Sequence, residues 1–382
     1  MKRNSILRDD HGAVAVLVIV VMVAFLGILA LVVDLGHLHT VQNELWNAAD
    51  ACALRGARAY VPDIVSNLSS VAPDPANAKS QASITIGANK SDNAALKDLP
   101  LTDIQVGIWN YETSNWVGGA PVWTWPPDAS LWGHYIGPGV GVFTKRSDSY
   151  NSGPVGMTLA QIFGISTVPV GTKATAALSG IGGFYPGTPV LPFGAWRDDP
   201  TDPTKPNPAL TPGQELLGVF RNDTSDTMGW TNLDPKNTNP SASEIKKIMN
   251  QGALYDCPFE STVGIQNGVA SSAIKAMTAP NNRFGLTPTA TNRNIYEPTG
   301  TNPDGVNYAD VVYMLPIYYS ESKDNKFNQS TVVGGIPVQI VRVTDSPENS
   351  IDVRIVSGPY VAPGYGGGAW YGILSTQPKL VK

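Results

Sequence analysis

Residues 13–33 read AVAVLVIVVMVAFLGILALVV and carry no charged side chain. An apolar helix of about 20 residues is long enough to cross a hydrocarbon layer of about 30 Å. The sequence therefore predicts a transmembrane helix that begins at Ala13, passes through Gly27 and ends at Val33.

The charges on either side of this run predict its orientation. Lys2, Arg3 and Arg8 precede the run, and Asp34 follows it. Basic residues stay on the cytoplasmic side of a membrane. We therefore expect residues 1–12 in the cytoplasm and the rest of the chain beyond Asp34 on the periplasmic side.

A cleaved signal peptide is the alternative to a retained anchor. Its apolar stretch would span about 7 to 15 residues, with a small-x-small cleavage site close behind it. The run here is longer, and the next such site, Ala57-Arg58-Ala59, lies far downstream. We therefore expect the helix to be retained.

The helix is expected to continue outside the membrane over residues 34–61. There is no proline between Leu35 and Tyr60, and Leu38, Leu45, Ala49 and Cys52 recur at helical spacings. This stripe of partly small residues could pack on the protein's own domain, or it could contact other single-span subunits, because small side chains let helices approach closely. We favour packing on the protein's own domain for most of this face. For the half of the helix inside the membrane, both interpretations stay open.

The first sixty residues resemble the N-terminal module of TadG-like proteins of the Tad/Flp pilus-assembly system. The resemblance rests on HGAVA at 11–15, the apolar run, DLG at 34–36 and NELWNAADACA at 43–53. His11, Trp46 and Cys52 depart from the usual Arg, Gln and Ala. The resemblance implies a structural or accessory component of the inner membrane that meets other Tad pilus-assembly or pilin subunits. It implies no catalytic residue and no cofactor.

The remainder resembles, more loosely, the C-terminal region found on such proteins. The segments involved are residues 104–109, 157–164, 172–177 and 266–269. Some relatives carry a von Willebrand factor A domain, whose metal site begins with Asp-x-Ser-x-Ser after a buried strand. Asp223, Ser225 and Thr227 follow the apolar residues 216–220 and nearly match that pattern. Arg221 and Asn222 interrupt the strand, so a polar turn is the preferred interpretation.

The region beyond the anchor is predicted to be α+β and rich in loops. Residues 80–180 are expected to form a β-rich subdomain, and residues 181–382 a second α+β subdomain or its continuation. Residues rich in β-branched and aromatic types predict strands at 83–87, 105–111, 140–144, 167–178, 311–319, 332–343 and 351–356. Helices are predicted at 158–163, 242–251 and 263–277, with long loops at 180–240 and 279–307. Ser241 and Glu244 form an expected capping box for the second helix.

Composition and motifs argue against an enzyme or a nucleic-acid-binding protein. The net charge is −5, and no basic face is available for phosphates. The sequence has no nucleophile elbow, zinc-protease motif or phosphate-binding loop. His37 and His39 are about 200° apart on a helix and cannot share a metal. Asp198, Asp199 and Asp202 are interpreted as a solvated loop, so we expect neither catalysis nor a cofactor.

Five of the nine tryptophans lie within residues 109–132, at Trp109, Trp116, Trp123, Trp125 and Trp132. Such a cluster favours a hairpin core, because aromatic side chains bury large areas. The alternative is an exposed partner or glycan surface, to which Trp109, Trp123 and Trp125 would contribute.

The two cysteines, Cys52 and Cys257, leave two outcomes open. An oxidising compartment permits a disulfide between them. A small buried thiol on the helical stripe is the other interpretation for Cys52.

The sequence thus predicts a single-span envelope protein of a Tad/Flp pilus system that works by position. One alternative is a minor pilin of the same system. Its peptidase would cut after Gly12 and typically needs Glu five residues further on, where this chain has Leu17. The other alternative is a membrane-tethered periplasmic glycan-binding protein or hydrolase, supported by the tryptophans and scattered carboxylates.

Overall fold

The fold is α+β, as predicted, in a computed structural model of the chain. The structure describes residues 10–61, 69–70, 73–97, 99–124, 131, 133–151, 153–198, 207, 210–220, 228–266, 271–319, 329–345, 348–356, 360–362 and 366–381. Two compact units can be distinguished, and neither is one continuous segment. Unit 1 comprises residues 1–53, 80–104 and 141–174, and unit 2 comprises residues 54–79, 105–140 and 175–382.

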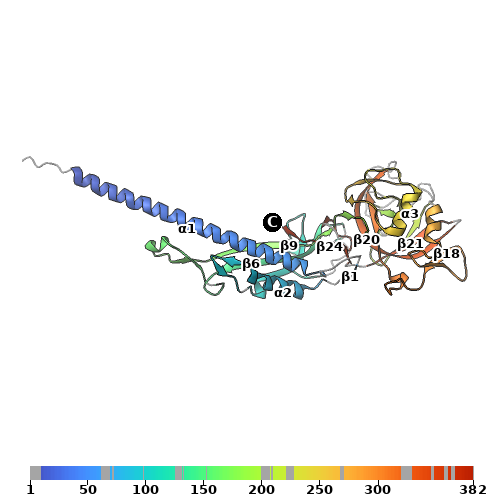
Figure 1. Cartoon of the computed structure of the whole chain (residues 1–382), viewed down its shortest axis with the longest axis horizontal. Coiled ribbons are helices and arrows are strands. Elements are labelled where there is room, and N and C mark those ends of the chain that lie inside the picture. Colours follow the sequence, from blue (N-terminus) through green and yellow to red (C-terminus); the bar gives the residue numbers. More distant parts are fainter. Residues whose placement is uncertain are drawn as a thin grey trace, which may run out of the picture. The chain divides into compact units, whose positions relative to one another are not determined.

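The long helix α1 runs without a break over Asp10–Arg58 (Figure 1). It contains the whole apolar run and most of the predicted extension, so the prediction of one continuous helix is confirmed. Beyond it, Tyr60 is 2% exposed in unit 2, where its hydroxyl donates a hydrogen bond of 3.0 Å to the carbonyl of Gly139.

The next element corrects a prediction, because residues 83–87 are helical and not a strand. Helix α2 spans Pro75–Thr85 and is followed by the 3-10 turn η1, Ile86–Ala88. The Asp74 carboxylate accepts hydrogen bonds from the backbone N–H groups of Ala76 and Asn77. With Pro75 at the first helical position, this is a strong helix start. It outweighs the β-branched residues at the helix end.

Unit 1 also contains two short hairpins. Strands β2 (Lys90–Ser91) and β3 (Ala94–Ala95) form the first, and β7 (Val155–Gly156) and β8 (Thr167–Val168) form the second. The predicted helix at 158–163 is present only as the 3-10 turn η5, Ala160–Phe163, at the end of the second hairpin. Gly164 ends this turn in the left-handed region at φ +84°. A continuing α-helix is thereby prevented.

One antiparallel sheet has the strand order β25-β9-β6-β4-β5. Its strands are β4 (Ile104–Asn110), β5 (Asn115–Trp116), β6 (Ile136–Arg146), β9 (Val170–Ala177) and β25 (Lys379–Val381). The predicted strands at 105–111 and 140–144 lie here, as does most of the predicted strand at 167–178, which forms β9. Pro169 separates β9 from β8, which pairs with β7. In unit 2, Trp109 and Trp116 face each other across β4 and β5.

Unit 2 contains a nine-stranded sheet whose main path is β13-β21-β20-β19-β12-β14, with β16, β17 and β18 attached beside β20. The strands are β12 (Phe193–Trp196), β13 (Glu215–Val219), β14 (Met228–Trp230), β16 (Thr262–Gly264), β17 (Leu286–Pro288), β18 (Ile295–Pro298), β19 (Tyr313–Tyr319), β20 (Gln329–Thr344) and β21 (Ser350–Ile355). The last three confirm predictions. Strands β12, β13, β14, β17 and β18 show that the predicted loop regions contain short strands.

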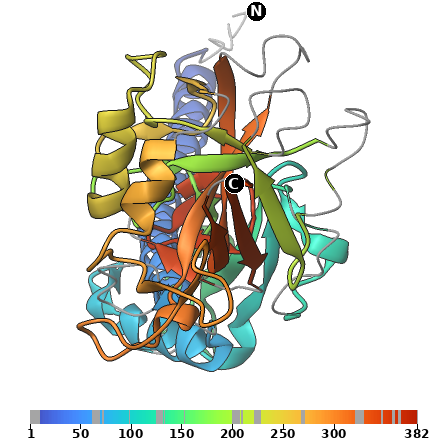
Figure 2. The ribbon, with the colours of Figure 1, turned by 90° about the vertical axis from the view of Figure 1, so that its right-hand side faces the viewer.

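Helices α3 (Ala242–Gln251) and α4 (Ser271–Met277) lie side by side in unit 2 (Figure 2). The predicted capping box is present: the Glu244 N–H donates to Ser241 Oγ, and the Ser241 N–H donates to the Glu244 carboxylate. The predicted helix at 263–277 is wrong at its start, where Val263 and Gly264 belong to β16 and pair with Ser330 and Gln329.

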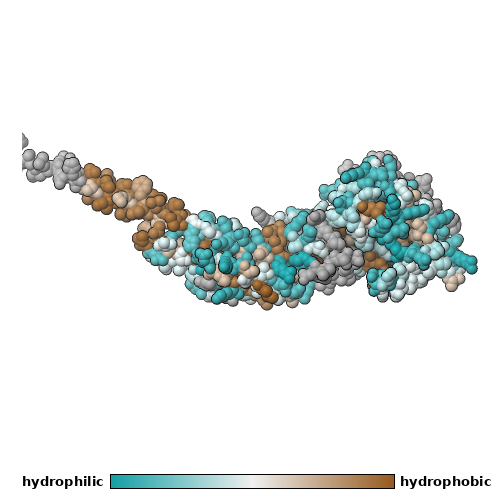
Figure 3. Space-filling model, viewed as in Figure 1, coloured by the Kyte–Doolittle hydropathy of each residue, from teal (hydrophilic) through white to brown (hydrophobic). Residues whose placement is uncertain are grey.

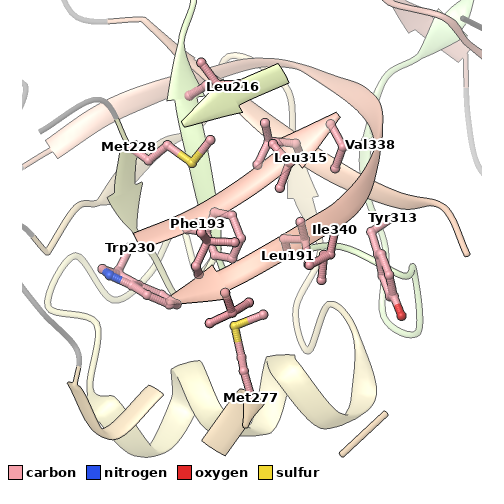
Figure 4. Close-up of a cluster of buried hydrophobic side chains, with 14 of the residues drawn as sticks. Leu191, Phe193, Leu216, Met228, Trp230, Met277, Tyr313, Leu315, Val338 and Ile340 are labelled. Atoms are coloured by element: carbon pink, nitrogen blue, oxygen red, sulfur yellow. The ribbon is translucent and has the colours of Figure 1, made fainter. Parts of the chain in front are cut away.

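The core of unit 2 lies between these helices and the nine-stranded sheet. Met277 from α4 points toward Phe193, Leu315 and Ile340 of the strands (Figure 4). A second sheet of unit 2 has the order β1-β22-β24-β10-β23, made of Ser69–Ser70, Tyr360–Ala362, Ile373–Ser375, Gly180–Ile181 and Gly366–Gly368. A small ladder pairs β11 (Gly183–Phe184) with β15 (Cys257–Pro258).

Candidate functional site: the anchor helix and its attachments

The N-terminal half of α1 presents its apolar side chains outward. The large apolar residues at positions 14–33 are each between 43% and 64% exposed. Exposed apolar surface of this extent is unfavourable in water and suits a hydrocarbon environment. Among the described residues, α1 is the one helix long and apolar enough to cross a membrane.

The C-terminal half of α1 turns a different kind of face inward. Leu45, Ala48, Ala49 and Cys52 are fully buried, and they recur three or four positions apart. The Thr144 hydroxyl of β6 donates a hydrogen bond of 3.0 Å to the carbonyl of Leu45. The small side chains thus let α1 approach its own domain closely, which supports the first interpretation of the stripe.

Asp34 attaches the hairpin of β7 and β8 to α1 at the end of the apolar run. Asp34 is 3% exposed, and its carboxylate accepts hydrogen bonds from the backbone N–H groups of Thr158, Leu159 and Ala160, at 3.0 Å for Thr158 and 3.1 Å for Leu159. Hydrogen bonds to an ionised acceptor are stronger than neutral ones. The carboxylate therefore satisfies the N–H groups at the start of the 3-10 turn and fixes its position against α1.

A second attachment, which we call the Asp92 clamp, comprises His37, Glu44, Asp92 and Arg146. His37 Nε2 donates to Asp92 Oδ1 at 2.9 Å, and the Asp92 N–H donates to Glu44 Oε2 at 2.6 Å. His37 and Glu44 are seven positions apart on α1, so they lie on the same side of the helix. Arg146 Nη1 approaches the other carboxylate oxygen at 3.1 Å.

The backbone of the β2–β3 turn presents Asp92 to its partners. Asp92 and Asn93 both have left-handed backbone angles, with φ of 54° and 59°. This is the geometry of a tight two-residue hairpin turn, which Asp and Asn tolerate better than other non-glycine residues. The hydrogen bond from His37, together with the charges of His37 and Arg146, keeps the pKa of Asp92 below its ordinary value despite partial burial.

Arg146 is the last residue of β6 and links this strand to the Asp92 clamp. Its side chain is 6% exposed. Besides Asp92, the guanidinium donates to the backbone carbonyls of Ser91 at 3.3 Å and Gly153 at 3.0 Å. A buried cation with a carboxylate and two carbonyl partners is stabilised by the arrangement around it. The clamp thus connects α1, the first hairpin and the sheet strand.

The carboxylates considered for a metal site do not gather in the part of the chain that the structure describes. Asp223, Ser225 and Thr227 lie outside the described residues, as do Asp199 and Asp202. The Asp198 carboxylate accepts a hydrogen bond of 2.8 Å from Nε of Arg197. No group of three or more His, Cys, Asp or Glu side chains suited to a metal occurs among the described residues.

The tryptophans that the structure describes favour the core interpretation. Trp109 and Trp116 are 7% and 6% exposed and form an edge-to-face pair with ring centroids 5.2 Å apart. Burial removes Trp109 from the candidate partner surface. Trp123 is half-buried and stacks on Tyr60 at 5.0 Å, while Trp125 and Trp132 lie outside the described residues.

The cysteines are both free and buried, so the structure contains no bridge between them. Burial raises the pKa of the Cys257 thiol to about 12, and the nearby Asp234 charge adds to the shift. Such a thiol is unreactive at neutral pH. Cys257 therefore behaves as a small apolar core residue.

The attachments of α1 were missing from the sequence-based prediction. The sequence presents Asp34 as a charge after the apolar run and as part of the DLG match at 34–36, and neither Asp92 nor Arg146 is a candidate residue there. One signal was available: Ser91-Asp92-Asn93-Ala94 has the composition of a tight hairpin turn between two short segments. The contact of Asp92 with His37 on α1 joins positions 55 residues apart and cannot be obtained from local spacing.

The division of α1 into a lipid-suited half and a domain-packed half coincides with a known sequence module. Residues 12–59 match the Tad family model, described as "Putative Flp pilus-assembly TadE/G-like". The resemblance of the N-terminal module is thereby confirmed. The match supports an accessory role in pilus assembly and interaction with other pilus components.

The matched residues cover α1 almost completely and end before α2. The resemblance of the C-terminal region therefore stays a prediction. No curated protein and no solved structure matches the chain.

Proposed function

We propose that the chain is an accessory component of a Tad/Flp pilus-assembly machine, held in the inner membrane by residues 13–33. Its N-terminus lies in the cytoplasm, and the bulk of the chain lies in the periplasm, where it contacts pilin or assembly subunits. It acts by position and contact, without catalysis or a cofactor.

This proposal rests on the difference between the two halves of the matched helix. One half of the Tad module exposes a run of apolar side chains, and the other half is packed into unit 1 through Leu45, Ala48 and Ala49. A plain membrane anchor needs no such second half. The module therefore serves to present a particular folded domain at a membrane surface.

The orientation follows from Lys2, Arg3 and Arg8, which precede the helix. These residues lie outside the described part of the chain. A reporter enzyme that is active only outside the cytoplasm should work when fused after Lys382 and fail when fused before Ala13. Cytoplasmic activity of a C-terminal reporter would contradict the orientation.

The function is tested by complementation of a deletion strain of the host that makes the pili. Val20→Arg should abolish piliation, because a guanidinium at the middle of a membrane helix costs about 2.5 to 3.5 kcal/mol on insertion scales. Asn43→Arg is the matched control on the exposed face of the same helix. It should leave piliation near normal.

The absence of catalysis is tested with single alanine variants in the same strain. Asp198→Ala, His134→Ala and Asp223→Ala remove polar side chains that an enzyme or a metal site would use. Each should support piliation within about twofold of wild type, because action by position requires no single titratable side chain. Loss of piliation in one such variant, with the protein folded and inserted, would refute action by position.

A further inference from the structure

The hairpin of β7 and β8 ends in an apolar tip that unit 1 leaves uncovered. We define the apolar tip as Ile162, Phe163 and Ile165, which are 76%, 67% and 50% exposed. There is no charged residue between Asp148 and Lys173, so the whole hairpin is uncharged. Three large apolar side chains on one uncharged loop are unfavourable in water and mark a contact surface.

The tip lies beside the apolar half of α1. A Cβ atom built on Gly27 would lie 3.7 Å from Phe163 Cζ. Gly27 and Ala30 are the two positions within residues 14–33 that are not exposed, and Ala30 is 4% exposed. Figure 3 shows brown, apolar surface on α1 and on the loop next to it.

The residues of α1 next to the hairpin show how far the apolar tip extends along the helix axis. Asp34 holds the start of the 3-10 turn, whereas Phe163 reaches back to Gly27. At 1.5 Å per residue, these two positions on α1 are about 10 Å apart along the helix axis. The tip therefore reaches well inside the segment that the hydrocarbon layer surrounds, and it does not stop at the level of Asp34.

The loop is also built so that its backbone tolerates an apolar environment. The Asp34 carboxylate accepts hydrogen bonds from the N–H groups of Thr158, Leu159 and Ala160. The Gly164 N–H donates to the Gln161 carbonyl at 2.9 Å, and the Ile165 N–H donates to the Ala160 carbonyl at 3.1 Å. Irregular backbone is acceptable near hydrocarbon only when its polar groups are paired in this way.

We propose that the apolar tip is a second membrane-contacting element, inserted into the periplasmic leaflet of the bilayer that α1 crosses. The inference rests on the proposed anchoring by α1. Lipid is the occupant favoured by continuity, because Phe163 packs against the lipid-facing run itself and the loop carries no charge for a polar partner. The tip covers one side of α1 and leaves the other sides to lipid.

The test uses the full chain in lipid vesicles with an environment-sensitive fluorophore at one introduced cysteine. Phe163→Cys and Ile162→Cys report on the tip, and both positions are exposed enough to accept a label without disturbing a core. Val20→Cys reports on the anchor. Ile84→Cys, on α2, is the matched control, since Ile84 is an equally exposed isoleucine at 68%. The wild-type chain gives the background from the buried native thiols.

Lipids carrying a nitroxide on an upper acyl-chain carbon then act as the quencher. We expect at least about a twofold loss of emission at both tip positions and at Val20→Cys, with little change at Ile84→Cys, because contact quenching needs the label within the acyl chains. Quenching at Val20→Cys without quenching at the tip would refute the inference and leave the anchor intact.

Two other outcomes have separate meanings. Absence of quenching at Val20→Cys would refute the proposed anchoring itself. Tip labels that emit as if buried, yet are not quenched by the lipid, would show that a second copy of the chain covers the tip, which also overturns the inference.

Discussion

The imidazole of His37 donates a hydrogen bond of 2.9 Å to the carboxylate of Asp92, although the two residues are 55 positions apart. His37 lies about one helical turn beyond the end of the apolar run. The turn that carries Asp92 is thereby held to α1 close to the C-terminal end of the apolar run. The bond makes the anchor helix part of the fold of unit 1.

Asp92→Asn should destabilise unit 1. The amide keeps the shape of the side chain but removes the charge that faces Arg146, whose side chain is 6% exposed. Breaking a buried ion pair costs up to about 3 to 5 kcal/mol, and the two carbonyl partners of Arg146 should limit the loss to about 1 to 3 kcal/mol. Chemical unfolding of the full chain in mild detergent measures it. Asp148→Asn, at an exposed position, should change the unfolding free energy by less than about 0.5 kcal/mol.

The same carboxylate should make the stability depend on pH. The pKa of Asp92 is lowered in the folded chain, first by the hydrogen bond from His37. Its stabilising contribution is therefore fully present above the unfolded-state pKa of about 3.9 and is lost as the pH falls through the lower folded-state value. The difference in unfolding free energy between wild type and Asp92→Asn should shrink as the pH falls from 5 toward 2. A constant difference over that range would contradict this assignment.

Asp34→Ala should release the hairpin of β7 and β8 from α1. The N–H groups of Thr158, Leu159 and Ala160 would lose their acceptor. Amide hydrogen exchange at these three positions should accelerate by roughly tenfold or more, because exchange follows local opening. Asn43→Ala, on the exposed face of α1, should leave these rates unchanged. Equal acceleration in both variants would indicate general loosening of the helix.

Leu45→Ala tests the packing of the second half of the Tad module. Leu45 is fully buried, and its removal leaves a cavity between α1 and the domain. Such changes cost about 2 to 5 kcal/mol. Leu35→Ala is the matched control, because Leu35 is 46% exposed on the same helix. Unfolding of both variants in detergent, monitored by near-ultraviolet circular dichroism, should show a clearly larger loss of stability for Leu45→Ala than for Leu35→Ala.

Alkylation decides the state of the cysteines. Both are free and buried, so iodoacetamide should modify neither appreciably in the folded chain at pH 7.5. Once the chain is unfolded without a reducing agent, mass spectrometry should find both Cys52 and Cys257 alkylated. A requirement for reductant before modification would show that the two thiols are bridged in the cell.

The long apolar helix and the fold class could be predicted because their signals are local. An uninterrupted apolar run defines α1, and the capping pair Ser241 and Glu244 gives the start of α3 correctly. The errors occurred where a short-range cue opposed a propensity. Asp74 and Pro75 begin a helix across residues expected to form a strand, and Gly164 stops a helix after one 3-10 turn.

The attachments of α1 could not be predicted from local patterns. A single Asp after an apolar run is compatible with solvent exposure, and only the fold brings the N–H groups of Thr158 and Leu159 to Asp34. The short strands of unit 2 have a similar cause. Strand β12, Phe193–Trp196, is only four residues long and is defined by its pairing with β14 and β19.

The unbroken course of α1 also determines how unit 1 meets other proteins. A domain on a loose tether would sample many orientations and lose entropy whenever a partner selected one of them. Here the helix enters unit 1 without a hinge and is held by Asp34, His37 and Glu44. If α1 crosses a membrane as proposed, lateral diffusion would carry unit 1 with a constant orientation relative to α1. A partner in the same membrane would then search for it in two dimensions and meet the same face at every encounter.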